Sequence, residues 1–182
     1  MLLLLGKTAA GKDSVKKELV NLGMKPIVTY TTRPMRDGEI DGVTYNFVTN
    51  EEFSRLDFEG FFLETTSYTV ANGDVWYYGT PLNQLDNDRV IIVNPDGLAA
   101  IKKLQSVCPV AVEILADEDV IWNRLRERGD DAPEARRRIN ADDEDFRDVD
   151  KYIDLAIRNE HTTPEKLAKI IKAYYEERVT EL

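Results

Sequence analysis

The chain begins with five apolar residues, Met1–Leu5, and a loop bounded by two glycines, Gly6–Gly11, follows directly. A short run without polar side chains is typical of a strand that is covered on both faces of a sheet. Residues Ser14–Leu22 repeat their apolar side chains at helical spacing, so a helix is predicted after the loop. A strand, a glycine loop and a helix in this order open an α/β unit, and they constrain the fold more than any other feature of the chain.

Three later apolar runs extend this pattern: Val90–Val93, Val110–Leu115 and Leu155–Ile157. Each is followed by apolar residues at helical spacing, and alternating strands and helices predict a parallel sheet flanked by helices. The last helix is expected to start with Thr163 as N-cap and Pro164 as its first residue. Its predicted apolar face consists of Leu167, Ile170, Ile171 and Tyr174.

Two segments interrupt the alternation. Residues 30–80 are rich in Thr, Tyr and Gly and contain short alternating runs, which predict a small antiparallel α+β lobe. Residues 123–148, called the lid below, are highly charged and show no apolar stripe, so we expect them to project into solvent as a mobile arm. The predicted organisation is one domain with a core (1–29, 81–122 and 149–182), an inserted lobe (30–80) and the lid.

Composition narrows the functional classes. The 182 residues carry 24 Lys and Arg against 34 Asp and Glu, a formal net charge of −10 that argues against a nucleic-acid or anionic-membrane partner. One cysteine excludes an intramolecular disulfide framework, and one histidine excludes a multi-histidine metal site. The apolar opening is far shorter than the ~20 residues of a membrane span, and no basic region precedes it. We therefore expect a cytoplasmic protein.

The loop Gly6-Lys-Thr-Ala-Ala-Gly11-Lys12 fits the P-loop pattern G-x-x-x-x-G-K, so the predicted sheet is of the P-loop NTPase type. Its glycines let backbone amides turn toward phosphate oxygens, and the next helix points its positive N-terminal end at the same anion. Lys12 is expected to reach the β- and γ-phosphates. The residues predicted to bind nucleotide phosphates are Gly6, Lys7, Thr8, Ala9, Ala10, Gly11, Lys12, Asp13 and Ser14.

The pattern departs at Asp13, which stands where a Ser or Thr usually ligates Mg²⁺. A carboxylate oxygen also suits Mg²⁺, and Ser14 supplies a hydroxyl next to it. Alternatively, Asp13 only stabilises the N-terminus of the helix, where an acidic residue is favourable. Both roles stay open, with Asp13 and Ser14 as candidate Mg²⁺ ligands.

Residues Thr31–Tyr45 contain a second candidate anion site. Arg33 and Arg36 flank a Pro turn, and Tyr45 follows a loop with two glycines. Two guanidinium groups near a phenol can hold a second phosphate group. From the residues alone, an exposed basic turn without a ligand is equally plausible.

The Thr31–Tyr45 segment resembles the nucleoside-monophosphate signature of guanylate kinases, and the P-loop lies at the expected distance before it. Four later segments are similar to that family in the same order, so the resemblance covers nearly the whole chain. They are Phe61–Glu64, Tyr77–Thr80, Arg124–Gly129 in the lid, and Tyr152–Asn159 at the last core strand.

The resemblance implies phosphorylation of GMP or dGMP by ATP with Mg²⁺, through direct in-line transfer. It implies that Lys12 and the loop amides hold the ATP phosphates. The implied acceptor-phosphate ligands are Arg33, Arg36, Tyr45 and Tyr78, with Glu39 orienting the arginines. The implied guanine contacts are Glu64, Thr29 and Thr80. The implied catalytic residues are Lys12, Arg33 and three lid arginines, Arg124, Arg128 and Arg138, which neutralise the phosphoryl group in transfer.

Two departures from the family pattern bear on these roles. Ile92 and Asn94 stand where the family carries acidic residues, and Asp96 replaces a glutamine, which leaves metal use and acceptor identity open. Asp13 or Asp96 is a candidate replacement for the lost charge. The lid is one residue shorter than the family pattern, so Arg136 and Arg137 stay alternatives to Arg138.

Two other functions stay open at this point: a kinase for another, deoxy or modified, nucleoside monophosphate, and a non-catalytic binding module of the same fold. The intact Gly6, Gly11 and Lys12 favour an enzyme over a module. We expect small-molecule nucleotides as partners and a monomer or homodimer as the assembly.

Overall fold

In the computed structural model, which describes residues 1–70 and 73–180, five strands form a parallel sheet in the order β2-β7-β1-β8-β9. Their bounds are Lys25–Pro26 (β2), Arg89–Ile92 (β7), Leu2–Leu5 (β1), Val110–Leu115 (β8) and Leu155–Arg158 (β9). The central position of β1 accounts for its composition, because a strand with neighbours on both sides and helices on both faces leaves no place for a polar side chain. All four residues of β1 are 0% exposed.

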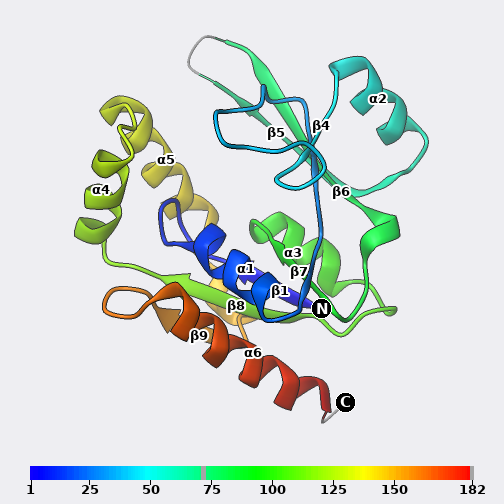
Figure 1. Ribbon diagram of the computed structural model, residues 1–182. Coiled ribbons are helices and arrows are strands. Elements are labelled where there is room, and N and C mark those ends of the chain that lie inside the picture. Colours follow the sequence, from blue (N-terminus) through cyan, green and yellow to red (C-terminus); the bar gives the residue numbers. More distant parts are fainter. Residues whose placement is uncertain (71–72, 181–182) are drawn as a thin grey trace. The chain divides into compact units, whose positions relative to one another are not determined.

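Five α-helices accompany this sheet in the described part of the chain (Figure 1). Their bounds are Lys12–Asn21 (α1), Pro95–Lys102 (α3), Glu118–Glu127 (α4), Ala132–Asp145 (α5) and Pro164–Thr180 (α6), and a 3₁₀ turn spans Val149–Tyr152. Helices α1 and α6 lie side by side and share one core with Leu2 and Leu4 of β1. The alternate residues Leu3 and Leu5 are equally buried, so the sheet is covered on its other face as well.

The last helix begins at Pro164, as the sequence predicts, but its buried face is shifted. Leu167 and Ile171 are buried, whereas Ile170 is 45% exposed, so its assignment to the apolar face is wrong. Tyr175 takes the next buried position, four residues after Ile171, because residues four apart share one side of a helix.

The lid folds as the end of α4, a turn and α5, and the prediction that it has no apolar stripe is wrong. Ala135 and Ile139 of α5 are buried against Ile121 and Leu125 of α4, and Ala9 of the glycine loop joins the same cluster. The two residues from α5 are four positions apart and therefore lie on one face of that helix. Two apolar positions are enough to attach a helix whose other residues are mostly charged.

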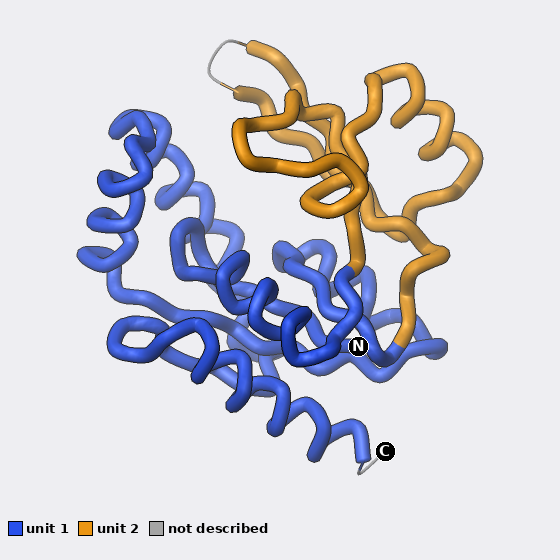
Figure 2. The backbone as a smooth tube through the Cα atoms, in the orientation of Figure 1, with its two compact units in different colours: residues 1–26, 87–182 blue, residues 27–86 orange. Residues whose placement is uncertain are grey.

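The chain divides into two units, which Figure 2 shows in different colours: unit 1 comprises residues 1–26 and 87–182, and unit 2 comprises residues 27–86. Unit 2 contains a four-stranded sheet in the order β4-β3-β6-β5. Its elements are Tyr30–Thr31 (β3), Asn46–Phe47 (β4), Asn50–Phe58 (α2), Phe62–Thr69 (β5), Val75–Pro81 (β6) and a 3₁₀ turn at Leu82–Gln84.

Most of the unit 2 sheet is antiparallel, as the sequence predicts, but β3 and β4 pair in parallel. The long connection between these two strands, which carries the two arginines of the second anion site, makes the parallel pairing possible. Phe53 of α2 stacks on Phe62 of β5 with ring centroids 4.7 Å apart, which attaches the helix to the sheet.

None of the helices within the described ranges is long and apolar enough to cross a membrane.

Candidate functional site

The glycine loop of unit 1 connects β1 to α1 and has an unusual backbone path. Gly6 and Gly11 have φ angles of 139° and 103°, and Ala9 has a φ of 54°. Positive φ angles turn successive backbone amides to one side, which creates a concave surface for an anion. The first amides of α1 have no helical partner and add to this surface.

Two neighbouring groups approach the loop glycines so closely that no side chain fits. A Cβ atom on Gly6 would lie 2.3 Å from the carbonyl oxygen of Ile114 in β8. A Cβ atom on Gly11 would lie 2.2 Å from the side-chain nitrogen of Asn159, which follows β9. The glycines are therefore required by packing as well as by their φ angles.

Lys12 turns its amine back onto the loop. Its Nζ atom donates to the carbonyl oxygens of Gly6 at 2.6 Å and Lys7 at 2.8 Å. Burial lowers the pKa of this amine, although nearby carboxylates of Asp13 and Asp142 oppose the shift. The side chains of Asp13 and Ser14, in the first turn of α1, are exposed.

Arg124 and Asn159 hold the loop by hydrogen bonds to its carbonyl oxygens. The guanidinium of Arg124 donates to the carbonyl oxygens of Ala9 and Ala10, both at 3.0 Å, and to that of Asn159. The buried Asn159 amide donates to the carbonyl oxygen of Ala10 at 2.7 Å. These bonds fix the loop through its carbonyl oxygens. The backbone amides of the loop are left to point away from Arg124 and Asn159.

The lid contacts the loop through two carboxylates of α5. The backbone amide of Thr8 donates to Oδ2 of Asp142 at 2.5 Å, and Nζ of Lys7 forms an ion pair with Asp143 at 2.5 Å. Neither acidic residue was predicted from the sequence, because only the cations of the lid suggested a role there. Asn159 was not predicted as a site residue either, although the end of a parallel strand is where ligand-binding loops gather.

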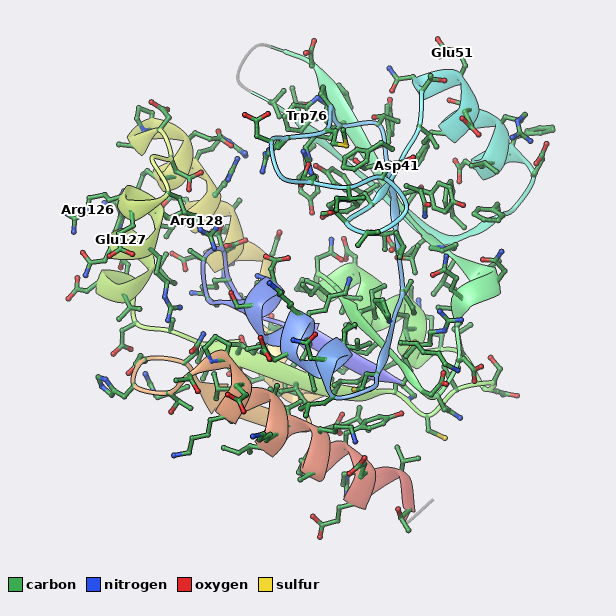
Figure 3. The ribbon with its side chains drawn as sticks, viewed as in Figure 1. Asp41, Glu51, Trp76, Arg126, Glu127 and Arg128 are labelled. Carbon is green, nitrogen blue, oxygen red and sulfur yellow. The ribbon has the colours of Figure 1, made fainter. Side chains whose placement is uncertain are left out.

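The other lid arginines differ in their surroundings. Arg128 and Arg126 leave the end of α4 in different directions (Figure 3), and the positive charge of Arg128 contributes to the lowered pKa of Lys12. Arg138 is partly buried and pairs with Glu134 and Asp130. The adjacent arginines are more exposed: Arg137 pairs with Glu134, and Arg136 pairs with Glu118 and lies over the Trp122 ring.

The start of α1 offers donors that suit Mg²⁺. Asp13 and Ser14 present oxygen atoms at the surface there, while across residues 1–70 and 73–180 no three His, Cys, Asp or Glu side chains gather as a metal site. Such a small donor set fits Mg²⁺, which usually keeps waters and binds one or two protein oxygens together with substrate phosphates. Asn94 is engaged in the fold, since its Oδ1 accepts from the amide of Gly97 and caps α3, while Asp96 is exposed in the same turn.

In unit 2, the buried Arg33 and the partly buried Glu39 form an ion pair with two parallel hydrogen bonds. The NH2 and NH1 atoms of Arg33 lie 2.7 and 3.0 Å from the two Glu39 oxygens. The Arg33 hydrogen bond lowers the pKa of Glu39, and a bond from the backbone amide of Arg36 adds to the shift. Glu39 thereby holds one guanidinium in place and also binds the turn that carries the exposed Arg36 side chain.

Aromatic rings surround this ion pair. The guanidinium carbon of Arg33 lies 5.4 Å from the Tyr45 ring centroid and 5.6 Å from that of Phe47. Tyr45 and Tyr78 are in edge contact, with centroids 6.0 Å apart. The structure therefore brings together the four residues predicted to hold the acceptor phosphate and the Glu39 carboxylate predicted to orient the arginines. The four are Arg33, Arg36, Tyr45 and Tyr78.

The residues predicted to contact a base also lie in unit 2. Glu64 of β5 faces Thr80 of β6, and the Thr80 hydroxyl donates to Glu64 Oε1 at 2.6 Å. Thr29 precedes β3, and its carbonyl oxygen accepts from the amide of Asn46. A carboxylate accepts hydrogen bonds on both oxygens, so Glu64 suits a ligand with adjacent N–H donors.

A family model, curated relatives and a solved structure all match this chain, and all are guanylate kinases. The guanylate kinase family model matches residues 1–174. A guanylate kinase of Nostoc sp. is 31% identical, with 88% of this chain and 82% of the relative covered, and one of Streptococcus agalactiae is 33% identical, with 92% and 83% covered. The crystal structure of guanylate kinase from Anaplasma phagocytophilum has the same fold, with a TM-score of 0.70 at 22% identity over 98% of this chain and 85% of that one.

Proposed function

We propose, from the premise that the chain belongs to the guanylate kinase family, that it transfers the γ-phosphoryl group of ATP to GMP or dGMP. The observation that carries the proposal is the family match over residues 1–174. It favours an enzyme over a non-catalytic module, in agreement with the intact Gly6, Gly11 and Lys12 of the loop.

We assign the ATP phosphates to unit 1. The amides of the Gly6–Gly11 loop bind the phosphate oxygens, and Lys12 leaves the loop carbonyls to neutralise their charge. Arg124 supports the loop through Ala9 and Ala10, and Arg128 and Arg138 supply further positive charge from the lid. Phosphoryl transfer needs this neutralisation more than it needs an acid or a base.

We assign the acceptor to unit 2. Arg33 is held by Glu39 through two of its nitrogens, and a guanidinium has five N–H donors, so it can bind a phosphate at the same time. Arg36, Tyr45 and Tyr78 add donors around it. Glu64 with Thr80 reads the N1–H and amino group of guanine, whereas a pyrimidine carbonyl would be repelled by the same carboxylate. Thr29 is a further base contact.

Mg²⁺ bound with ATP would be held by Asp13 and Ser14 and would supply charge neutralisation at the phosphates. The single cysteine of the chain supports a reducing, cytoplasmic location. The acidic net charge argues against a nucleic acid and is compatible with small nucleotides as ligands.

The proposed function is tested by ADP release from ATP and Mg²⁺ with a panel of acceptors: GMP, dGMP, AMP, CMP, UMP and dTMP. We expect turnover with GMP and dGMP only, because Glu64 accepts from both guanine donors. Lys12→Ala should abolish turnover, and Lys17→Ala, on the exposed side of the same helix, serves as the control for lost charge. Turnover with another monophosphate would contradict the acceptor assignment, and no turnover with any of them would contradict the enzyme.

A further inference from the structure

Asp142 of the lid contacts the P-loop at one of its backbone amides. Its Oδ2 accepts a hydrogen bond from the backbone amide of Thr8, one of the loop amides. The next residue, Asp143, pairs with the amine of Lys7 in the same loop. Two consecutive carboxylates of α5 therefore bind the part of the chain that otherwise attracts anions.

The charges around Asp142 resemble those around a bound phosphate. Burial raises the pKa of the Asp142 carboxyl, and the Asp145 charge adds to the shift. The hydrogen bond from Thr8 and the positive charges of Lys12 and Lys7 oppose this rise in pKa. The amine of Lys12 is at the same time satisfied by loop carbonyl oxygens. The donors of the loop are thus partly satisfied by oxygens of the protein itself.

The placement of α5 makes this contact specific. Ala135 and Ile139 pack against α4 and Ala9, so the helix is attached to the loop by apolar contacts as well. Asp142 lies three residues after Ile139 and therefore close to the same side of α5. A carboxylate at this position is directed to the loop by the fold of the lid.

We propose that Asp142 is an internal competitor of the nucleotide: its carboxylate occupies the phosphate position at the Thr8 amide, and ATP binds only when it leaves. The inference rests on the proposed function, because it assumes that the loop binds ATP. The competition makes the lid an affinity-determining element, since any state that fills the loop lowers the fraction of molecules competent to bind ATP.

The first test measures anion binding without metal, by calorimetry with inorganic tripolyphosphate, and then binding of ATP with Mg²⁺. Asp142→Asn keeps the shape of the side chain and removes its charge. We expect both ligands to bind about tenfold more tightly, the factor for a loop that is filled in roughly nine-tenths of the molecules. Glu144→Gln is the matched control, because Glu144 lies on the same helix, pairs with Arg147 and carries the same charge.

The second test distinguishes competition from simple charge repulsion. The amide proton of Thr8, followed by NMR, should lose the downfield shift of a charge-assisted hydrogen bond in Asp142→Asn and keep it in Glu144→Gln. In the wild-type protein, tripolyphosphate should change this resonance at the concentration at which binding is seen.

Four results would overturn the inference. Unchanged affinity in Asp142→Asn would show that the carboxylate does not compete, and the proposed function would stand if ATP still binds. Tighter binding without a change at Thr8 would reduce the effect to long-range repulsion. Weaker binding of ATP only when Mg²⁺ is present would make Asp142 a metal-site residue instead. Absence of ATP binding from both proteins would overturn the proposed function together with the inference.

Discussion

Arg33 keeps only 5% of its surface exposed, although a guanidinium is costly to remove from water. The two bonds to Glu39 and the rings of Tyr45 and Phe47 replace the lost hydration. A planar, forked group makes this arrangement possible, and an ammonium group cannot reproduce two parallel bonds. The residue type at this position therefore matters beyond its charge.

Replacement Arg33→Lys should raise the KM for GMP by roughly tenfold or more, the effect of losing about 1.4 kcal/mol of phosphate binding. The KM for ATP should change little, because the proposed ATP residues lie in unit 1. Steady-state kinetics with each substrate varied in turn measures both constants.

Arg55→Lys is the matched control for Arg33→Lys. Arg55 lies exposed on α2 of the same unit and pairs with Glu59, so both KM values should stay at wild-type levels. A rise of both KM values in Arg33→Lys, or no rise at all, would contradict the assignment of Arg33 to the acceptor phosphate.

Single residues also show what sequence patterns could predict of the site. The spacing of Gly6, Gly11 and Lys12 identified the loop, because this motif is local in the chain. The positive φ of Ala9 was not predictable, since a residue with a side chain rarely adopts it. Asn159 and Asp142 reach the loop from more than 130 positions away, and no local pattern contains them.

At the scale of elements, β2 is too short to show an apolar run, but the other four strands of the parallel sheet were predictable from their apolar runs. The lid was not. Its buried apolar residues, Leu125, Ala135 and Ile139, are too few to produce a clear helical stripe among charged neighbours. The parallel pairing of β3 with β4 was equally hidden, because each strand has only two residues.

The contribution of the lid to the stability of the fold should depend on pH through Glu134. Hydrogen bonds from Arg137 and Arg138 lower the pKa of this carboxyl to about 2. A lowered pKa stabilises the fold above the ordinary pKa of 4.5, and the contribution is lost as the pH falls toward 2. Glu134→Gln should therefore be less stable than wild type by about 1 kcal/mol at pH 6, allowing for solvent screening, and the difference should shrink at pH 3.

Urea unfolding at the two pH values measures this difference. Glu127→Gln, an exposed position on α4, is the control and should match wild type at both. A difference between Glu134→Gln and wild type that stays constant or grows on acidification would contradict the role of Glu134.

At the scale of the whole molecule, the proposed ligands are divided between the two units of the chain. Unit 2 is one continuous insertion, residues 27–86, between β2 and β7 of the parallel sheet. Its boundaries lie outside the predicted lobe of residues 30–80. The proposed assignment therefore gives each unit a nucleotide of its own.

Hydrogen exchange should separate the two responses. ATP alone should slow exchange of the Gly6–Ser14 amides, and GMP alone should slow exchange in Thr29–Tyr45 and Tyr77–Thr80. A ligand at 100 times its dissociation constant stabilises the state that it binds by about 2.7 kcal/mol, roughly a hundredfold in protection. Mass spectrometry of peptides from each unit measures the effect.

Tripolyphosphate is the control for this experiment and should protect the loop without affecting Thr29–Tyr45. Protection of the loop by GMP alone, or of unit 2 by ATP alone, would contradict the division of ligands between the units.

The close approaches at Gly6 and Gly11 limit how this nucleotide site could be reused in protein engineering. Transplanting the seven residues Gly6–Lys12 into another strand–helix connection would carry the glycines and the lysine, but not the Ile114 carbonyl or the Asn159 amide that border them. The smallest portable piece comprises the ends of three adjacent strands, β1, β8 and β9, which come from distant parts of the chain. A recipient scaffold would have to supply that sheet edge before the loop could work in it.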